Sequence, residues 1–131
     1  WVTGSHGGTY SANTLACAAA AATIKVMKDE KLDVNAAERG EQLMAGLRKL
    51  QEKYPIIGDV RGRGCMVATE FVTEGKPDAA AAKALIGAAR DEDLLLLGCG
   101  TYNNTIRWIP ALVINEDEIH EALSRFEAAL K

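Results

Sequence analysis

A glycine-rich stretch at residues 4–13 runs directly into an alanine-rich segment that continues to about residue 28. Glycine has no Cβ, so backbone N–H groups in such a stretch can converge, and a helix that starts behind them adds further donors for an anion. Thr9 contributes a hydroxyl that can donate to a phosphate oxygen. A tight turn followed by a helix capped by Asn13 explains the same pattern, and spacing alone favours this simpler structure. The stretch matches neither common nucleotide-binding fingerprint.

The totals fit one compact domain. The chain has 131 residues, and its 15 basic and 18 acidic residues give a net charge of −3. There is no basic stripe, which argues against binding to nucleic acid, and no apolar run is long enough to span a bilayer. Cys17, Cys65 and Cys99 are too widely spaced for a metal site, so we predict no metal and three core cysteines in a reduced, cytoplasmic protein.

Helix signals occur four times along the chain. Asn13 precedes the first helical segment, whose apolar residues recur at helical spacing. Asn35 and Asn115 each stand three residues before a glutamate, a pattern typical of a helix N-terminus in which the two side chains cap each other. We therefore predict helices at residues 14–28, from the cap Asn35 to before Pro55, at residues 79–92, and from the cap Asn115 to about Leu130, with a turn at residues 31–33.

Strand signals fall between these helices. Val67, Thr69 and Phe71 alternate with Ala68 and Glu70, which indicates a strand with one buried face. Strands are predicted at residues 57–63, 66–72, 94–97 and 105–109, with a bend at Gly62 and Gly64, a turn at residues 74–78 and a loop at residues 98–104. Strand pairs joined by turns indicate an α+β fold, in which helices cover one face of a small antiparallel sheet.

Arg107 is the strongest candidate for a functional side chain. It lies in an otherwise apolar strand, and a guanidinium there must find acceptors because a buried, unpaired charge is costly. A structural ion pair or a position that faces solvent also explains this arginine. Arg61 and Arg63 flank Gly62, and we predict that they form structural salt bridges.

Three stretches resemble motifs of the class III, or omega-type, pyridoxal-phosphate-dependent aminotransferases, in the same order and at the same spacing. Residues 4–16 are similar to the family's segment G-T-H-G-G-T-x-G-G-N-P-L-A. Residues 60–66 are similar to its strand V-R-G-x-G-L-M, and residues 94–110 to its run L-L-L…N-x-I-R-x-x-P. The chain departs from these motifs at a few positions, among them Ala12 in place of a glycine and Cys65 in place of a leucine.

The resemblance implies the C-terminal small domain of a fold-type I pyridoxal-phosphate enzyme. Residues 1–13 would form a loop at the cofactor phosphate, residues 14–30 a helix between domains, and residues 31–131 the small domain. The resemblance also implies a homodimer with active sites between subunits and a catalytic lysine upstream of Trp1. We therefore expect no catalytic residue in this chain, and no activity from the chain alone.

Within the site, the resemblance implies that Arg107 binds the α-carboxylate of the amino-acid or keto-acid substrate, a task that suits its planar fork of donors. Gly8 and Thr9 would contact the phosphate of pyridoxal 5'-phosphate in the partner subunit. The loop that holds Cys99 and Tyr102 is expected at the substrate entrance and is most similar to that of 4-aminobutyrate aminotransferases, which transfer the amino group to 2-oxoglutarate. The alternatives are an ornithine or acetylornithine aminotransferase, another class III member, or a non-catalytic binding or dimerisation module.

Overall fold

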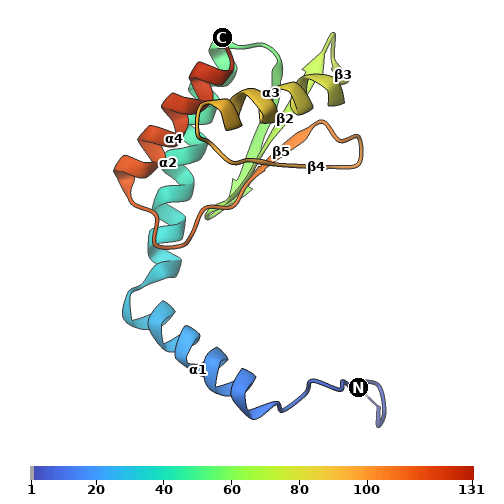
Figure 1. The fold of residues 1–131 in the computed structure, drawn as a ribbon, viewed down its shortest axis with the longest axis vertical. Helices are drawn as coiled ribbons and strands as arrows, with labels where there is room; N and C mark the ends of the chain where they lie inside the picture. The colour runs from blue at the N-terminus through green and yellow to red at the C-terminus, as the bar shows by residue number, and fades with distance from the viewer. Residues whose placement is uncertain (1) are drawn as a thin grey trace. The chain divides into compact units, whose positions relative to one another are not determined.

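The computed structural model describes residues 2–131, and Trp1, the first residue of the predicted phosphate loop, lies outside them. The packing divides the chain into two units, of which the first ends at Leu32 and the second is Asp33–Lys131. In chain order, the elements are α1 (Thr14–Asp29), α2 (Leu32–Lys53), β1 (Ile57–Arg63), β2 (Met66–Thr73), β3 (Lys76–Pro77), α3 (Ala79–Asp91), β4 (Leu97–Cys99), β5 (Thr105–Trp108) and α4 (Glu116–Ala129). Figure 1 labels all of them except β1, which is the strand before β2. Among the helices of residues 2–131, none combines the length and the apolar composition that crossing a bilayer requires.

The first unit consists of short turns followed by α1. Asn13 caps this helix as predicted, because its Oδ1 accepts a hydrogen bond of 2.9 Å from the backbone N–H of Ala16. No residue of α1 is buried, so the apolar positions that recur at helical spacing, such as Leu15 and Val26, are exposed. The helix itself is therefore predictable from local signals, whereas the surface that its apolar side chains contact is not.

The three cysteines occupy three different environments. Cys17 is exposed because α1 buries none of its residues, so the prediction of a core position is wrong for this cysteine. Cys65 follows β1 in the β1–β2 turn and is buried, and burial raises the pKa of its thiol. Cys99 ends β4 and is half-buried. Only Cys65 is a core cysteine of the predicted kind.

β1, β2, β5 and β4 form an antiparallel sheet in that order, and the short β3 pairs with β2. Val67 lies opposite Trp108, and Thr69 lies opposite Ile106, so these four side chains share one face of the sheet. All four are buried, and the apolar ones belong to a core that α2, α3 and α4 complete on that face. The helices contribute Leu43, Leu47 and Leu50 of α2, Ala82 and Leu85 of α3, and Ile119 and Phe126 of α4. This arrangement confirms the predicted α+β fold (Figure 1).

Two glycines inside α2 mark places where other groups come very close to the helix. A Cβ on Gly40 would lie 2.1 Å from the carbonyl oxygen of Gly64 in the β1–β2 turn. A Cβ on Gly46 would lie 2.2 Å from a methyl carbon of Leu123 in α4. Glycine inside a helix costs about 1 kcal/mol relative to alanine. Here the missing side chains let α2 pack closely against the turn and against α4.

The predicted start of the second helix is wrong. α2 begins at Leu32, so residues 31–33 are not a separate turn, and Asn35 lies inside the helix rather than at its cap. The side-chain Nδ2 of Asn35 instead donates hydrogen bonds to the carbonyl oxygens of Leu112 and Ile114, at 2.8 and 2.9 Å. These bonds fix the connection between β5 and α4 against α2. The asparagine thus serves a distant part of the chain, which a local pattern does not reveal.

The other predicted boundaries differ less. Asn115 caps α4 as predicted: its Oδ1 accepts from the backbone N–H of Glu118, and the carboxylate of Glu118 accepts from the backbone N–H of Asn115, both at 2.9 Å. The predicted strand at residues 94–97 is wrong except for Leu97, where β4 begins, because pairing with β5 starts only there. Leu94 and Leu96 pack against the core without forming a strand, and Leu95 is exposed.

Candidate functional site

Arg107 is positioned by the alternation of side chains along β5. Its neighbours Ile106 and Trp108 are 0% and 4% exposed and face the core under the helices. The side chain of Arg107 therefore lies on the opposite face of the sheet, where it is exposed. Its direct neighbours across the strands are Ala68 in β2 and Leu97 in β4. The fold thus places one guanidinium on an interior strand, on the face that the helices do not cover.

Within residues 2–131, the guanidinium of Arg107 forms no hydrogen bond and no ion pair. The structural ion pair considered for this arginine is therefore not made by any described residue. Ala68 and Leu97, directly beside it, have no polar side-chain atoms that compete for its five N–H donors. A carboxylate that approached this face would meet a cation whose donors are all available.

Arg61 lies on the same face, but it is ion-paired. Its Nη1 pairs with the carboxylates of Asp59 and Glu70, the latter at 2.8 Å. Hydrogen bonds to Asp59, and then to Glu70, raise the pKa of Arg61 above its usual value. The predicted structural salt bridge is confirmed for Arg61, whereas Arg63 has no ion-pair partner within the part of the chain that the structure describes. Because Arg61 occupies both carboxylates of this face, neither neutralises Arg107.

Asn104 fixes the backbone directly before β5, and the sequence patterns did not identify it as a functional residue. Its side chain is 2% exposed, and its Nδ2 donates a hydrogen bond of 2.9 Å to the carbonyl oxygen of Phe71. The backbone N–H of Phe71 in turn donates to the carbonyl oxygen of Asn104, at 2.7 Å. These two bonds tie the start of β5 to the end of β2. The available sequence signal was an asparagine directly before an apolar strand.

The two residues predicted at the substrate entrance, Cys99 and Tyr102, lie at the end of β4 and in the loop between β4 and β5; the predicted loop at residues 98–104 is wrong at residues 98 and 99, which belong to β4. Cys99 lies opposite Thr105, on the same face of the sheet as Arg107. Tyr102 is 66% exposed in the turn that follows. A contact between either side chain and a substrate remains a prediction.

The predicted phosphate loop lies in the first unit, whereas Arg107 lies in the second. The backbone N–H of Ser11 donates to the carbonyl oxygen of Gly8 at 3.1 Å, which closes a turn around Thr9. The hydroxyl of Thr9 has no partner within residues 2–131, and both Gly8 and Thr9 are exposed. A Cβ on Gly8 would lie 2.9 Å from the Oγ of Ser11, so the turn is tight at this position. An exposed hydroxyl on a tight glycine turn fits the phosphate contact that the resemblance implies.

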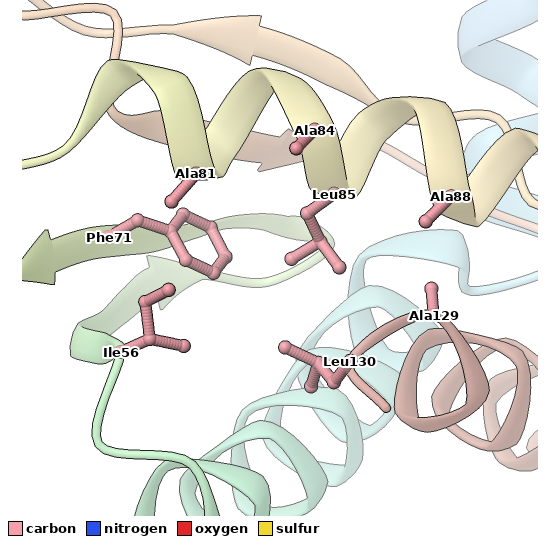
Figure 2. A pocket seen from close by; sticks show the side chains of 8 residues that line it. All are labelled: Ile56, Phe71, Ala81, Ala84, Leu85, Ala88, Ala129 and Leu130. Atoms are coloured by element: carbon pink, nitrogen blue, oxygen red, sulfur yellow. The ribbon is translucent and has the colours of Figure 1, made fainter.

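A cavity of about 260 Å³ lies on the helix-covered side of the sheet, as Figure 2 shows. Side chains from α3, the C-terminal end of α4, β2 and the connection before β1 line it, and all are alanine, isoleucine, leucine or phenylalanine. Without a polar or charged side chain in its lining, this cavity is not suited to bind a charged amino acid. Phe71, which lines it, belongs to the core face of β2, the face opposite Arg107. The structure also contains no group of three or more His, Cys, Asp or Glu side chains, within residues 2–131, that could hold a metal ion.

The comparisons with known proteins agree with the motifs. The family model described as aminotransferase class-III matches residues 1–130. The 5-aminovalerate aminotransferase DavT of Pseudomonas putida is 45% identical over 126 residues, which cover 95% of this chain and 30% of DavT. The 4-aminobutyrate aminotransferase GabT of Escherichia coli is 42% identical over 123 residues, which cover 92% of this chain and 29% of GabT.

The solved structures give the same result for the fold. A PLP-bound amine transaminase from an uncultivated Pseudomonas species superposes with a TM-score of 0.86 at 35% identity, covering 98% of this chain and 30% of that one. The chain therefore spans about 30% of the length of the relatives that it matches. Since a family model covers almost every residue and three motifs agree with it in order, the chain belongs to the class-III aminotransferase family.

Proposed function

We propose that the protein carrying this chain is an aminotransferase that moves an amino group from an omega-amino acid to 2-oxoglutarate with the help of pyridoxal phosphate. The family and the names of two similar relatives, which act on 5-aminovalerate and 4-aminobutyrate, support this class of amine donor. When bound, pyridoxal phosphate supplies the electron sink for this chemistry. The residues of this chain contribute binding and orientation.

The observation that carries the proposal is the unpaired guanidinium of Arg107 on the uncovered face of the sheet. Arginine can give a carboxylate two parallel, charge-assisted hydrogen bonds, and we call this arrangement the carboxylate clamp. Because the two groups are then coplanar, they fix the direction in which the rest of the bound substrate extends from the guanidinium. We assign to Arg107 the carboxylate adjacent to the keto or amino carbon. Held at that end, the reacting carbon is kept at a constant distance from the guanidinium.

Gly8 and Thr9 take the second role in the proposal, as contacts to the cofactor phosphate. The tight turn at Gly8 and the exposed hydroxyl of Thr9 support an anion contact from this loop. We propose that the loop serves the partner subunit of a homodimer, so that residues 1–13 complete a neighbouring active site. In this scheme residues 14–30 are the helix between domains and residues 31–131 the small domain.

The proposal also concerns the chain alone and its cellular setting. We assign no catalytic residue to this chain, and we expect no keto-acid formation by it above that of pyridoxal phosphate in buffer. The three cysteines are all free thiols, which suits a reducing, cytoplasmic protein.

The substitution Arg107→Lys in the full-length enzyme tests the proposed clamp. Lysine keeps the charge but loses the bidentate geometry, so we expect the KM for 2-oxoglutarate to rise by roughly 30-fold, the equivalent of about 2 kcal/mol. The acceptor 4-oxobutanoate has the same chain and the same distal carboxylate but lacks the carboxylate next to the carbonyl. Its KM should hardly change.

Arg63→Lys is the matched control, because Arg63 lies on the same face of the sheet and also lacks an ion-pair partner within residues 2–131. This control should leave both KM values unchanged. Equal KM values for 2-oxoglutarate in the wild type and in Arg107→Lys would remove Arg107 from the substrate site.

A further inference from the structure

A buried polar pair lies directly beside the proposed clamp and is not explained by it. Thr69 in β2 is 0% exposed, and Trp108 in β5 is 4% exposed. The indole Nε1 of Trp108 donates a hydrogen bond of 2.8 Å to the Oγ1 of Thr69. Buried polar groups are costly unless they are paired, so each of these two groups depends on the other. Apolar side chains of similar shape, such as valine and phenylalanine, could fill the same space without any hydrogen bond, so the polar pair has a function that packing alone does not explain.

The bond runs diagonally across the ladder between β2 and β5. Trp108 lies opposite Val67, and Thr69 lies opposite Ile106, so the bond joins residues from two successive pairs. Diagonal neighbours on one face of a sheet lie within reach of an aromatic side chain. A slip of one residue would turn the indole N–H to the opposite face and away from this acceptor, so the bond stabilises the observed register against such a slip.

Register decides where Arg107 points. Side chains alternate along a strand with a period of two, so a slip of one residue would turn Arg107 toward the core and Trp108 toward the open face. The ring of Trp108 is also fixed from the helix side, by an edge-to-face contact with Phe126 at 4.9 Å between ring centroids and an interplanar angle of 79°. One ring thus connects α4, the hydroxyl of Thr69 and the backbone next to Arg107.

We propose that Thr69 and Trp108 are positioning residues for Arg107, and that their hydrogen bond sets how tightly the protein holds the carboxylate next to the reacting carbon. This inference rests on the proposed function, since it assigns to Arg107 the role of carboxylate clamp. Neither Thr69 nor Trp108 contacts the substrate, because both side chains lie on the core face of the sheet. They act through the backbone of β5.

The test uses Thr69→Val in the full-length enzyme, which removes the acceptor and keeps the branched shape. We expect the KM for 2-oxoglutarate to rise about fivefold, as the loss of one buried hydrogen bond would give, while the KM for 4-oxobutanoate stays within about twofold of the wild type. Thr69→Ser keeps the hydroxyl and should restore the wild-type ratio of the two KM values. Thr73→Val makes the same chemical change further along β2, at an exposed hydroxyl that pairs with Asp78, and should leave the ratio unchanged.

A second variant guards against a folding defect in Thr69→Val. The double change Thr69→Val with Trp108→Phe removes both partners, so it leaves no buried N–H without an acceptor. This variant should also raise the KM ratio. An unchanged ratio in the double variant, or a rise that Thr69→Ser shows equally, would overturn the positioning role.

The two proposals fail in different ways. If Arg107→Lys changes the KM ratio and the Thr69 variants do not, the clamp stands and the positioning role is wrong. If Arg107→Lys leaves the ratio unchanged, the clamp itself is wrong. With both roles correct, adding Thr69→Val to Arg107→Lys should raise the ratio by much less than about fivefold, because coupled residues are not additive.

Discussion

Three glycines lie inside the helices of residues 2–131, and replacing each of them by alanine should change the stability of the protein by a different amount. The chemical change is the same at Gly40, Gly46 and Gly87, and in an unconstrained helix it would stabilise the protein by about 1 kcal/mol. What differs is the space that the new methyl group would enter. A Cβ on Gly87 in α3 would have no neighbouring atom within 4 Å, so Gly87→Ala should raise the free energy of unfolding by the full gain of about 1 kcal/mol.

At Gly40 the new methyl group would meet backbone. Its carbon would lie 2.1 Å from the carbonyl oxygen of Gly64 and 2.4 Å from the carbonyl carbon. Carbon and oxygen ordinarily approach to about 3.3 Å, so α2 and the β1–β2 turn would have to separate by about 1.2 Å. Overpacking of this kind costs about 3 kcal/mol when backbone must move, and the helix gain offsets about 1 kcal/mol of that. We expect a net loss of about 2 kcal/mol.

At Gly46 the obstacle is the end of a side chain. The closest atom is a methyl carbon of Leu123 at 2.2 Å, and Leu123 is only half-buried. This leucine can turn toward solvent, so the clash and the helix gain should nearly cancel. Gly46→Ala is therefore expected between the other two variants.

Thermal unfolding followed by far-UV circular dichroism measures the series. In a domain of this size 1 kcal/mol corresponds to about 4 °C. The midpoint should rise by about 4 °C in Gly87→Ala, change little in Gly46→Ala and fall by about 8 °C in Gly40→Ala. If Gly40→Ala were as stable as Gly87→Ala, the close contact between α2 and the β1–β2 turn would be wrong.

Two further predictions concern helix caps. Asn115→Ala should reduce the free energy of unfolding by about 1 kcal/mol, seen as a lower urea midpoint, because it removes the reciprocal cap of α4; an unchanged midpoint would contradict the cap. Asp78 caps α3, and hydrogen bonds from the backbone N–H of Ala81 and then from Thr73 lower the pKa of its carboxyl group below the usual 3.8. Its folded-state pKa is the lower one, so its stabilisation is complete only well above pH 3.8, declines as the pH approaches that value, and is lost as the pH falls through the folded-state pKa. The stability difference between the wild type and Asp78→Asn should thus be constant from neutral pH to about pH 5 and shrink in more acid solution, and a difference that grows with acid would refute the assignment.

Local signals were sufficient for most of the fold. Asn13 and Asn115 cap the helices that they were expected to cap, because a cap needs only groups within three residues. The alternation of Val67, Thr69 and Phe71 predicted a strand with one buried face, and the structure buries all three. A strand covered on one face carries that information in its own sequence.

The same kind of signal failed at Asn35, and the reason is tertiary. Asn35 and Asn115 both stand three residues before a glutamate, so they are indistinguishable locally. The amide of Asn35 binds two carbonyl groups that lie 77 and 79 residues further along the chain. A helix can then continue through this residue back to Leu32. Such long-range hydrogen bonds can override a capping pattern, and the residues next to Asn35 in the sequence do not reveal them.

The candidate site could be predicted from the sequence only in part. One arginine in an otherwise apolar strand marked Arg107 as a candidate functional residue, and the motif around it predicted that it binds a carboxylate. Neither pattern could tell whether a carboxylate of this chain already forms an ion pair with Arg107. That depends on which strands flank β5. The neighbours of Arg107 are Ala68 and Leu97, whereas Arg61, on the same face, lies beside Asp59 and Glu70. Two arginines with the same local alternation thus differ because strand pairing places two carboxylates beside Arg61, whereas Arg107 has no carboxylate partner within residues 2–131.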